Sequence, residues 1–357
     1  MTNEINTYKY GRTYTPITVT KLIILVIVAF AFLLVSCRKE QNTNESVLFV
    51  PQTPIGFPEM LYPEDNPYSY EAWLLGRSLF YDTRLSLNND LNCASCHKQN
   101  IGFADNVPLS AGDNGALGTT NAPTLINVGY QPYFLFAGGV PTLEMQVLVP
   151  IQEHHEFNTN ILDIVNLLST DVRYQNLSEL AYDRSFDAFV LTRAIANFQR
   201  SLVSGNSRFD QYFYQNKQTL TDSEIRGYNL FNSDRTNCAS CHSGFNFTSY
   251  AFENNGLYEE YSNDGRMLIT FNEADKAKFK IPTLRNIGLT APYMHDGSFT
   301  NLMQVIDHYN AGGVNHPNKS HLIQPLNLSI DEKQDLLNFL LSLTDFSMIN
   351  NPNFSKP

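Results

Sequence analysis

Apolar residues recur at helical spacing in several short stretches of this chain. Residues 71–81 predict an amphipathic helix, whose apolar stripe consists of Trp73, Leu74, Leu75, Leu79 and Phe80. Thr221 and Glu224 form a capping-box pattern that opens a second helix. The same pattern, at Ser329 and Glu332, opens a third helix, which we expect to pack on the second.

The rest of the pattern also favours helices over strands. Two further helical stretches are predicted at residues 161–168 and 186–202. Gly- and Asn-rich segments at 111–121 and 254–264 predict loops, and no strand pattern of any length occurs. The fold is therefore predicted to be mainly α, with small helical domains joined by long loops.

One short pattern occurs twice along the chain. Residues 76–80 and 227–231 both follow Gly-x-x-Leu-Phe. Each copy leads into an identical Cys-Ala-Ser-Cys-His segment, at residues 93–97 and 238–242. The two repeats indicate an internal duplication of one helical unit.

The Cys-x-x-Cys-His form is that of a c-type haem attachment site. Two thiols add to the vinyl groups of one haem, and the histidine is held under the iron as its proximal ligand. The residues predicted to bind two haems are therefore Cys93, Cys96, His97, Cys238, Cys241 and His242. A zinc site built from both segments is an alternative, and so is a thiol–disulfide pair, although that pair would not require the histidine.

Composition narrows the range of functions. A length of 357 residues suggests about two domains. The formal net charge of −11 argues against nucleic acid as a partner. Four of the five cysteines belong to the two repeated segments, and c-type haem is attached outside the cytoplasm, so we expect an exported protein.

The N-terminal stretch predicts a targeting segment. Lys21 precedes an uncharged apolar run over residues 22–35, which is shorter than the roughly 20 residues of a membrane span. The run ends in a Leu-Val-Ser-Cys pattern that resembles a bacterial lipobox, so Cys37 is predicted to be lipidated. We expect a lipoprotein signal peptide over 1–37 and a flexible tether over 38–55. An uncleaved anchor helix is the alternative.

The two haem-attachment motifs and several further segments make the chain resemble the bacterial di-haem cytochrome c peroxidases and the related di-haem oxygenases that mature methylamine dehydrogenase. The matching segments span residues 76–86, 121–124, 143–146, 282–286 and 290–298. The resemblance implies two cytochrome-c-like domains, each with one covalent haem. These are a peroxidatic domain over 56–208 and an electron-transfer domain over 209–345, followed by a tail over 346–357.

The resemblance also implies roles around the N-terminal haem. A distal carboxylate there moves a proton from the near to the far oxygen of peroxide. Glu156 matches this glutamate, and Gln146 matches a nearby distal glutamine. The neighbouring rivals for the acid/base role are Glu153, His154 and His155.

Two residues depart from the family's pattern. Many of these peroxidases have a histidine that blocks the peroxidatic iron until the other haem is reduced, and Asp113 stands at that position. The resemblance therefore implies a permanently open N-terminal haem. Phe136 stands where the family often has a tryptophan between the haems, and the only tryptophan, Trp73, is elsewhere. A phenylalanine is a poor site for electron hopping.

Metal ligands complete what the resemblance implies. Tyr309 matches the sixth ligand of the C-terminal haem, where typical peroxidases have a methionine. Its rivals in this sequence are Met294, Met303 and His308. A calcium ion is expected between the domains, and its matching ligands are the Asn121 side chain and the backbone carbonyls of Thr290 and Pro292.

The resemblance implies a peroxidase that reduces hydrogen peroxide to water. Electrons from a small c-type cytochrome or cupredoxin would reach the C-terminal haem and cross to the N-terminal haem. Asp113 and Tyr309 favour an alternative, a di-haem oxygenase or protein-modifying enzyme that uses high-valent iron, whereas Phe136 counts against it. A tethered di-haem electron carrier is a third possibility. We expect a lipid-anchored protein on the periplasmic side of a bacterial envelope, and the family often forms homodimers.

Overall fold

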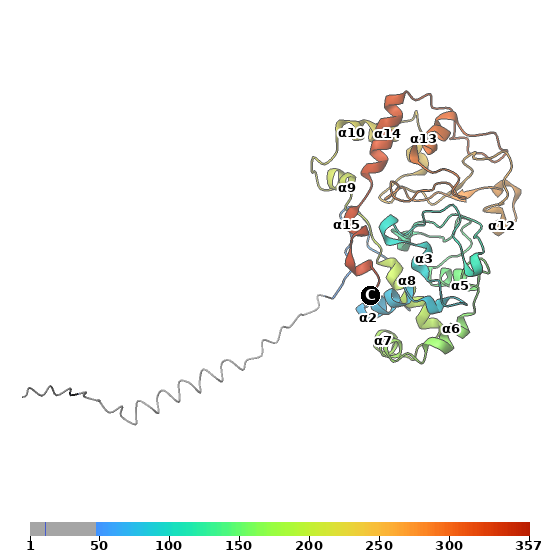
Figure 1. Ribbon diagram of the computed structural model, residues 1–357. Helices are drawn as coiled ribbons and strands as arrows, with labels where there is room; N and C mark the ends of the chain where they lie inside the picture. The colour runs from blue at the N-terminus through green and yellow to red at the C-terminus, as the bar shows by residue number, and fades with distance from the viewer. Residues whose placement is uncertain (1–10, 12–47) are drawn as a thin grey trace, which may run out of the picture. The chain divides into compact units, whose positions relative to one another are not determined.

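Helices make up most of the regular structure in the part of the chain that the computed structural model describes, Gly11 and residues 48–357. The predicted signal peptide over 1–37, with Cys37, and all but the end of the predicted tether lie outside these residues. Residues 49–357 form one compact unit (Figure 1). Within the described part, no helix combines the length and the apolar character that a membrane crossing needs.

The secondary structure confirms a mainly α-helical fold. The α-helices are α2 (Tyr70–Phe80), α3 (Cys93–Cys96), α4 (Leu143–Gln146), α5 (Leu148–Gln152), α6 (Ile161–Leu168), α7 (Val172–Tyr182), α8 (Ala188–Arg200), α9 (Arg208–Phe213), α10 (Asp222–Phe231), α11 (Cys238–Cys241), α12 (Met267–Thr270), α13 (Leu302–Ala311), α14 (Ile330–Ser342) and α15 (Phe346–Ile349). Short 3-10 helices are η1 (Thr83–Leu85), η2 (Gln99–Ile101), η3 (Asp113–Gly115), η4 (Val128–Tyr130), η5 (Glu273–Asp275) and η6 (Pro352–Phe354). Strands β1 (Phe252–Glu253) and β2 (Phe279–Lys280) pair antiparallel.

Helix boundaries follow the capping residues of the sequence. The predicted capping boxes at Thr221 and Ser329 are formed, and they open α10 and α14. Helix α6 has its predicted bounds. Helix α8 begins two residues later than predicted because the Asp187 side chain accepts a hydrogen bond from the Val190 N–H and caps the helix there. The hydrophobic pattern does not predict α13, which opens with a capping box at Asn301.

The repeated glycine lies at a helix crossing in both copies. A Cβ on Gly76 would lie 1.8 Å from the Ala194 carbonyl oxygen of α8, and one on Gly227 would lie 2.0 Å from the Asp335 carbonyl oxygen of α14. Contacts between α2 and α8, and between α10 and α14, are the most extensive helix contacts in the described chain (Figure 1). The third helix therefore packs on the second as predicted, and the same crossing recurs in the first repeat.

Replacing Gly227 with Ala is expected to destabilise the protein by about 1–3 kcal/mol, the usual cost of overpacking. The new methyl group would clash with a backbone carbonyl, which cannot rotate away as a side chain can. Denaturant unfolding of the haem-loaded protein measures the loss. Asn229→Ala, at an exposed position of the same helix, is the matched control and should change stability little. Equal stability of G227A and the parent would contradict this packing.

Buried apolar clusters surround both Cys-Ala-Ser-Cys-His segments. Two clusters include side chains of α2 and α8, and Cys93 packs against both of them. A third cluster joins Phe231 of α10 to Phe339 of α14, and Cys238 packs against it. The division at residues 208 and 209 stays a prediction, since α9 runs across it.

Both ends of the described chain pack near α2. Phe49 lies against Trp73 at a ring-centroid distance of 4.7 Å, so the chain is packed from this residue on rather than from residue 56. At the other end, Met348 and Phe354 are buried in the same cluster as Trp73. Arg77 of α2 donates hydrogen bonds to the Ser355 carbonyl at 2.8 Å and to the Pro352 carbonyl at 2.9 Å. The predicted C-terminal tail is thus part of the core around α2.

Candidate functional site

Each Cys-Ala-Ser-Cys-His segment forms a helical turn that ends at its histidine. Helices α3 and α11 contain the first four residues of the segments. In both, the histidine N–H donates to the carbonyl of the first cysteine at 2.9 Å. Two cysteines and one histidine therefore share a single turn, the arrangement that covalent attachment of haem uses.

The two histidines have the same ring orientation relative to the backbone. His97 Nδ1 lies 3.0 Å from the Phe103 carbonyl oxygen, and His242 Nδ1 lies 3.1 Å from the Phe247 carbonyl oxygen. Since a carbonyl only accepts, each Nδ1 carries the hydrogen and each Nε2 keeps its lone pair. Burial lowers the pKa of both histidines, to about 4 for His242. Both rings are neutral at neutral pH, which is the form that binds iron.

A single cavity of about 470 Å³ reaches both segments and has a mainly apolar lining. The six predicted haem-binding residues line it: Cys93, Cys96, His97, Cys238, Cys241 and His242. The four cysteines are free thiols, and burial is the main cause that raises their pKa values, to about 12 for Cys93. Free thiols beside a neutral histidine, in an apolar cavity, fit a covalently attached haem at each segment.

The described residues do not form the alternative zinc site. Among them, no group of three or more histidine, cysteine, aspartate or glutamate side chains is placed to hold a metal ion. A structural zinc site needs four such ligands in a tetrahedron. The two repeated segments therefore do not converge on one metal ion.

Glu156 lies at the end of the cavity that the first segment forms. Besides burial, its carboxylate contributes to the raised pKa values of Cys93 and Cys96, and it has no such effect on the cysteines of the second segment. By its surface area Glu156 is an exposed residue, like Glu153 and His154, but it differs from them in lining the cavity. Desolvation by the protein atoms near the carboxyl group raises the pKa of Glu156, and the charge of Glu153 raises it further.

The rival residues of the same stretch have other contacts. Glu153 is exposed, and its carboxylate accepts a hydrogen bond from the His155 ring at 3.1 Å. His154 is exposed as well, and its Nδ1 lies 2.7 Å from Asn158 Oδ1. Of these rivals only His155 lines the cavity, together with Glu156. Glu156 is the carboxylate of this stretch that reaches the cavity, and Gln146 lines the cavity as well.

Asp113 is buried and does not line the cavity. Its carboxylate accepts hydrogen bonds from the side-chain amides of Asn88 at 2.6 Å, Asn114 at 2.7 Å and Asn158 at 3.2 Å. Its backbone N–H donates to the Glu156 carbonyl oxygen at 2.7 Å. These bonds tie the loop over 111–121 to the segment that carries Glu156, so Asp113 acts as a fixed support of that segment.

Replacing Gly112 with Ala is expected to lower any turnover that depends on Glu156 by up to about 100-fold, because misplacing a reacting group by about 1 Å can cost that much. A Cβ on Gly112 would lie 2.0 Å from the His155 carbonyl oxygen and 2.7 Å from Glu156 Cα, so the distal segment must move. Gly118→Ala is the matched control in the same loop, since its Cβ would meet nothing closer than 3.8 Å. Steady-state kinetics compare the two. Equal rates in both variants would show that the position of Glu156 does not matter.

Only two of the four candidate ligands near the second segment line the cavity. Tyr309 and Met294 line it, whereas Met303 and His308 do not. Burial is the main cause that raises the pKa of Tyr309 to about 12, and the nearby thiols of the second segment add to the rise. Tyr309 is thus a half-buried phenol beside the second segment, and Met294 is its remaining rival.

Asn255 links these two candidates, although sequence reasoning did not single it out. Its amide donates to Met294 Sδ at 3.3 Å and also hydrogen-bonds the Tyr309 side chain. Its backbone carbonyl lies 3.0 Å from His308 Nε2, which turns that ring away from the cavity. The residue lies in a loop of 254–264 that the sequence pattern describes only as Gly- and Asn-rich, so no motif could have marked it.

The predicted calcium ligands Asn121, Thr290 and Pro292 all line the same cavity. The Asn121 amide nitrogen donates to the carbonyls of Val107 at 3.0 Å and Pro108 at 3.1 Å. The amide oxygen of Asn121 is therefore the end of the side chain that can face a cation. Calcium accepts such neutral oxygen ligands, and the residues fit it.

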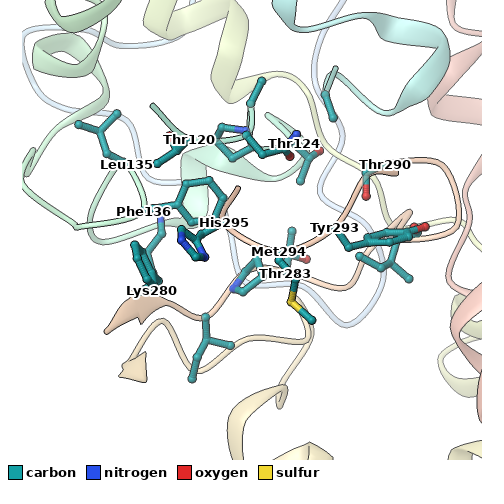
Figure 2. A pocket seen from close by; sticks show the side chains of 18 of the residues that line it. Thr120, Thr124, Leu135, Phe136, Lys280, Thr283, Thr290, Tyr293, Met294 and His295 are labelled. Atoms are coloured by element: carbon teal, nitrogen blue, oxygen red, sulfur yellow. The ribbon is translucent and has the colours of Figure 1, made fainter. Parts of the chain in front are cut away.

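The residues between the two segments are shown in Figure 2. Phe136 lines the cavity, and its side chain lies near those of Lys280 and His295 (Figure 2). Trp73 does not line the cavity. It is buried in the core, where its Nε1 donates to Ser201 Oγ at 3.0 Å. The tryptophan of this chain is thus a packing residue, and Phe136 holds the position beside the cavity.

Comparison with known proteins gives one consistent family. The model of the di-haem cytochrome c peroxidase family matches residues 70–219. The methylamine utilization protein MauG of Methylophilus methylotrophus is 32% identical over 314 residues, which cover 87% of this chain and 94% of that protein. The cytochrome c551 peroxidase of Nitrosomonas europaea is 34% identical over 244 residues, 65% of this chain and 71% of that protein.

Solved structures agree with these relatives. A MauG-like protein associated with microbial copper homeostasis superposes with a TM-score of 0.82 at 36% identity, over 85% of this chain and 98% of that one. The di-haem peroxidase BthA from Burkholderia thailandensis shares the fold, with a TM-score of 0.70 at 21% identity over 86% and 96% of the two chains.

Proposed function

The chain belongs to the di-haem cytochrome c peroxidase family, and on that premise we propose that it reduces hydrogen peroxide to water. Its electrons would come from a small c-type cytochrome or cupredoxin. The observation that supports this most directly is the place of Glu156, a carboxyl of raised pKa in the cavity beside the first haem-binding segment.

The chain's own residues account for proton transfer. The bound haems supply iron that exchanges electrons and, at the first segment, binds peroxide. The Glu156 carboxylate takes the proton of the near peroxide oxygen and returns it to the far oxygen, which leaves as water. The Gln146 amide lies on the same cavity and positions the peroxide through a hydrogen bond. The bond from His97 Nδ1 to the Phe103 carbonyl would orient the ring that holds the iron.

The second haem is proposed to receive the electrons. Tyr309 is our choice for its sixth ligand, since it is half-buried beside the second segment and lines the cavity. We place the peroxidatic domain at 56–208 and the electron-transfer domain at 209–345, each with one covalent haem. A calcium ion held by Asn121, Thr290 and Pro292 would lie between them.

We further propose that the protein works at the periplasmic side of a bacterial envelope. Lipidation of Cys37 would anchor it to a membrane, and the acidic chain would meet a basic electron donor. We also propose that two copies pair in a homodimer, as is common in the family.

A steady-state assay tests the proposed function. The haem-loaded protein is mixed with hydrogen peroxide and a reduced small c-type cytochrome, and oxidation of the cytochrome is followed. Rapid oxidation that depends on peroxide is expected. The absence of any reaction with peroxide would contradict the role of Glu156. It would favour the alternative hypothesis that the protein is a tethered di-haem electron carrier.

A second candidate is an oxygenase that modifies a protein. Two observations favour it: Asp113 is turned away from the cavity, and Tyr309 lines it. Peroxide consumption with little cytochrome oxidation in the same assay would select this candidate.

A further inference from the structure

Lys280 is a buried lysine without an acidic partner. It belongs to strand β2 and is 9% exposed. Its Nζ donates to two neutral acceptors, the Gln131 side-chain oxygen and the Tyr133 carbonyl, the latter at 2.8 Å. No carboxylate of the described residues lies within ion-pair distance of this ammonium. Burial lowers its pKa to about 8.

The nearest acidic residue along the paired strands, Glu253, also lines the cavity but forms no ion pair with Lys280. In the antiparallel pair β1 and β2, Lys280 lies opposite Phe252, and Glu253 lies opposite Phe279. Because side chains alternate between the two faces of a strand pair, Glu253 and Lys280 project to opposite faces. The protein therefore buries a cation that no carboxylate of the described residues contacts directly, and such burial is costly unless another group pairs with the cation.

Lys280 lines the cavity that the two haem-binding segments share. No other lysine or arginine in residues 48–357 does so. Each haem carries two propionate carboxylates at one edge, and a buried carboxylate is stabilised by a charge-assisted hydrogen bond from a cation. The unbalanced lysine and the unbalanced propionates are thus complementary in charge and share one cavity.

We propose that the Lys280 ammonium binds a haem propionate and so fixes that haem against the loop that carries Phe136. The same residue holds this loop at three points, since its backbone N–H donates to the Phe136 carbonyl at 2.8 Å in addition to the two bonds from Nζ. Figure 2 shows Lys280 and Phe136 on the same side of the pocket. Lys280 is therefore a positioning residue at the passage between the two haems. The proposal rests on haem binding and not on peroxide chemistry.

Replacement of Lys280 by Gln tests the charge. The amide retains a donor for the Tyr133 carbonyl but removes the cation next to the haem, so the oxidised, more positive iron is stabilised. We expect K280Q to retain both covalent haems and to show a lower midpoint potential for one of them in a spectroelectrochemical titration. Lys278→Gln is the matched control, because Lys278 pairs with Asp275 at 3.3 Å and does not line the cavity. Its potentials should equal those of the parent.

A second measurement needs no variant. Resonance Raman spectra of the parent protein are recorded in light and in heavy water. The propionate bending band of one haem should shift on deuteration, as it does when the propionate accepts a hydrogen bond from an ammonium group. A band that does not respond, or a K280Q protein with two haems and unchanged potentials, would overturn the proposal and leave Lys280 as a loop anchor only. Both readouts are independent of peroxide, so a failure of the peroxidase function leaves them interpretable.

Discussion

Replacing Glu156 with Gln is expected to lower peroxide-dependent turnover by about 10²–10⁴-fold, the usual contribution of a positioned acid/base group. Glutamine has nearly the same shape but cannot take a proton from the peroxide. Both haems should remain covalently bound with unchanged visible spectra, because Glu156 is not one of the residues that would attach or ligate either haem. Turnover of the haem-loaded variant with a reduced small cytochrome measures the effect.

The pH profile makes this result specific to proton transfer. Glu156 must begin as a carboxylate, and burial together with the Glu153 charge raises its pKa. Turnover of the parent should therefore fall as the pH is lowered, with a midpoint above the ordinary glutamate range, and this limb should be absent in E156Q. Glu153→Gln is the control, since this exposed carboxylate does not line the cavity. Parent-like turnover in E156Q, or a loss in E153Q as large as that of E156Q, would refute the assignment.

Replacing Tyr309 with Met is expected to raise the reduction potential of one haem by on the order of 0.1 V or more, since axial ligands tune haem potentials over roughly 0.8 V. A phenolate ligand stabilises ferric iron, whereas a thioether favours the ferrous state. Potentiometric titration followed by visible spectroscopy measures the shift, and the potential of the other haem should stay unchanged.

Met294→Leu separates the two remaining candidates for this ligand. Both side chains line the cavity, and Asn255 bonds to each of them. If Tyr309 binds the iron, M294L should keep the parent's potentials. The opposite pattern, with a shift in M294L and none in Y309M, would assign the ligand to Met294.

Local signals in the sequence predict much of the helical framework. Capping boxes at Thr221 and Ser329 locate α10 and α14, because a cap depends on residues only three positions apart. The repeated glycines of residues 76–80 and 227–231 have a shared physical cause, the close helix crossing that only a residue without Cβ permits. Weakly amphipathic helices such as α7 lack a comparable signal, and their tertiary contacts stabilise them instead.

The candidate site, too, could be predicted from the sequence only where its residues are neighbours along the chain. Cys-x-x-Cys-His is contiguous in sequence, so the residues that would bind haem can be read directly. Asp113 illustrates what cannot be read, since its role depends on amides of Asn88 and Asn158, which lie far away along the chain. Asn255 and Lys280 are similar, because only the folded cavity reveals which polar side chains face it.

The most direct test of the account is an electron paramagnetic resonance spectrum of the fully oxidised protein. We expect an open iron on the Glu156 side and a six-coordinate iron on the Tyr309 side, with Asp113 outside the cavity. We predict one high-spin ferric signal and one low-spin ferric signal before any electron is added. Two low-spin signals, with the high-spin signal formed only after partial reduction, would contradict the open site.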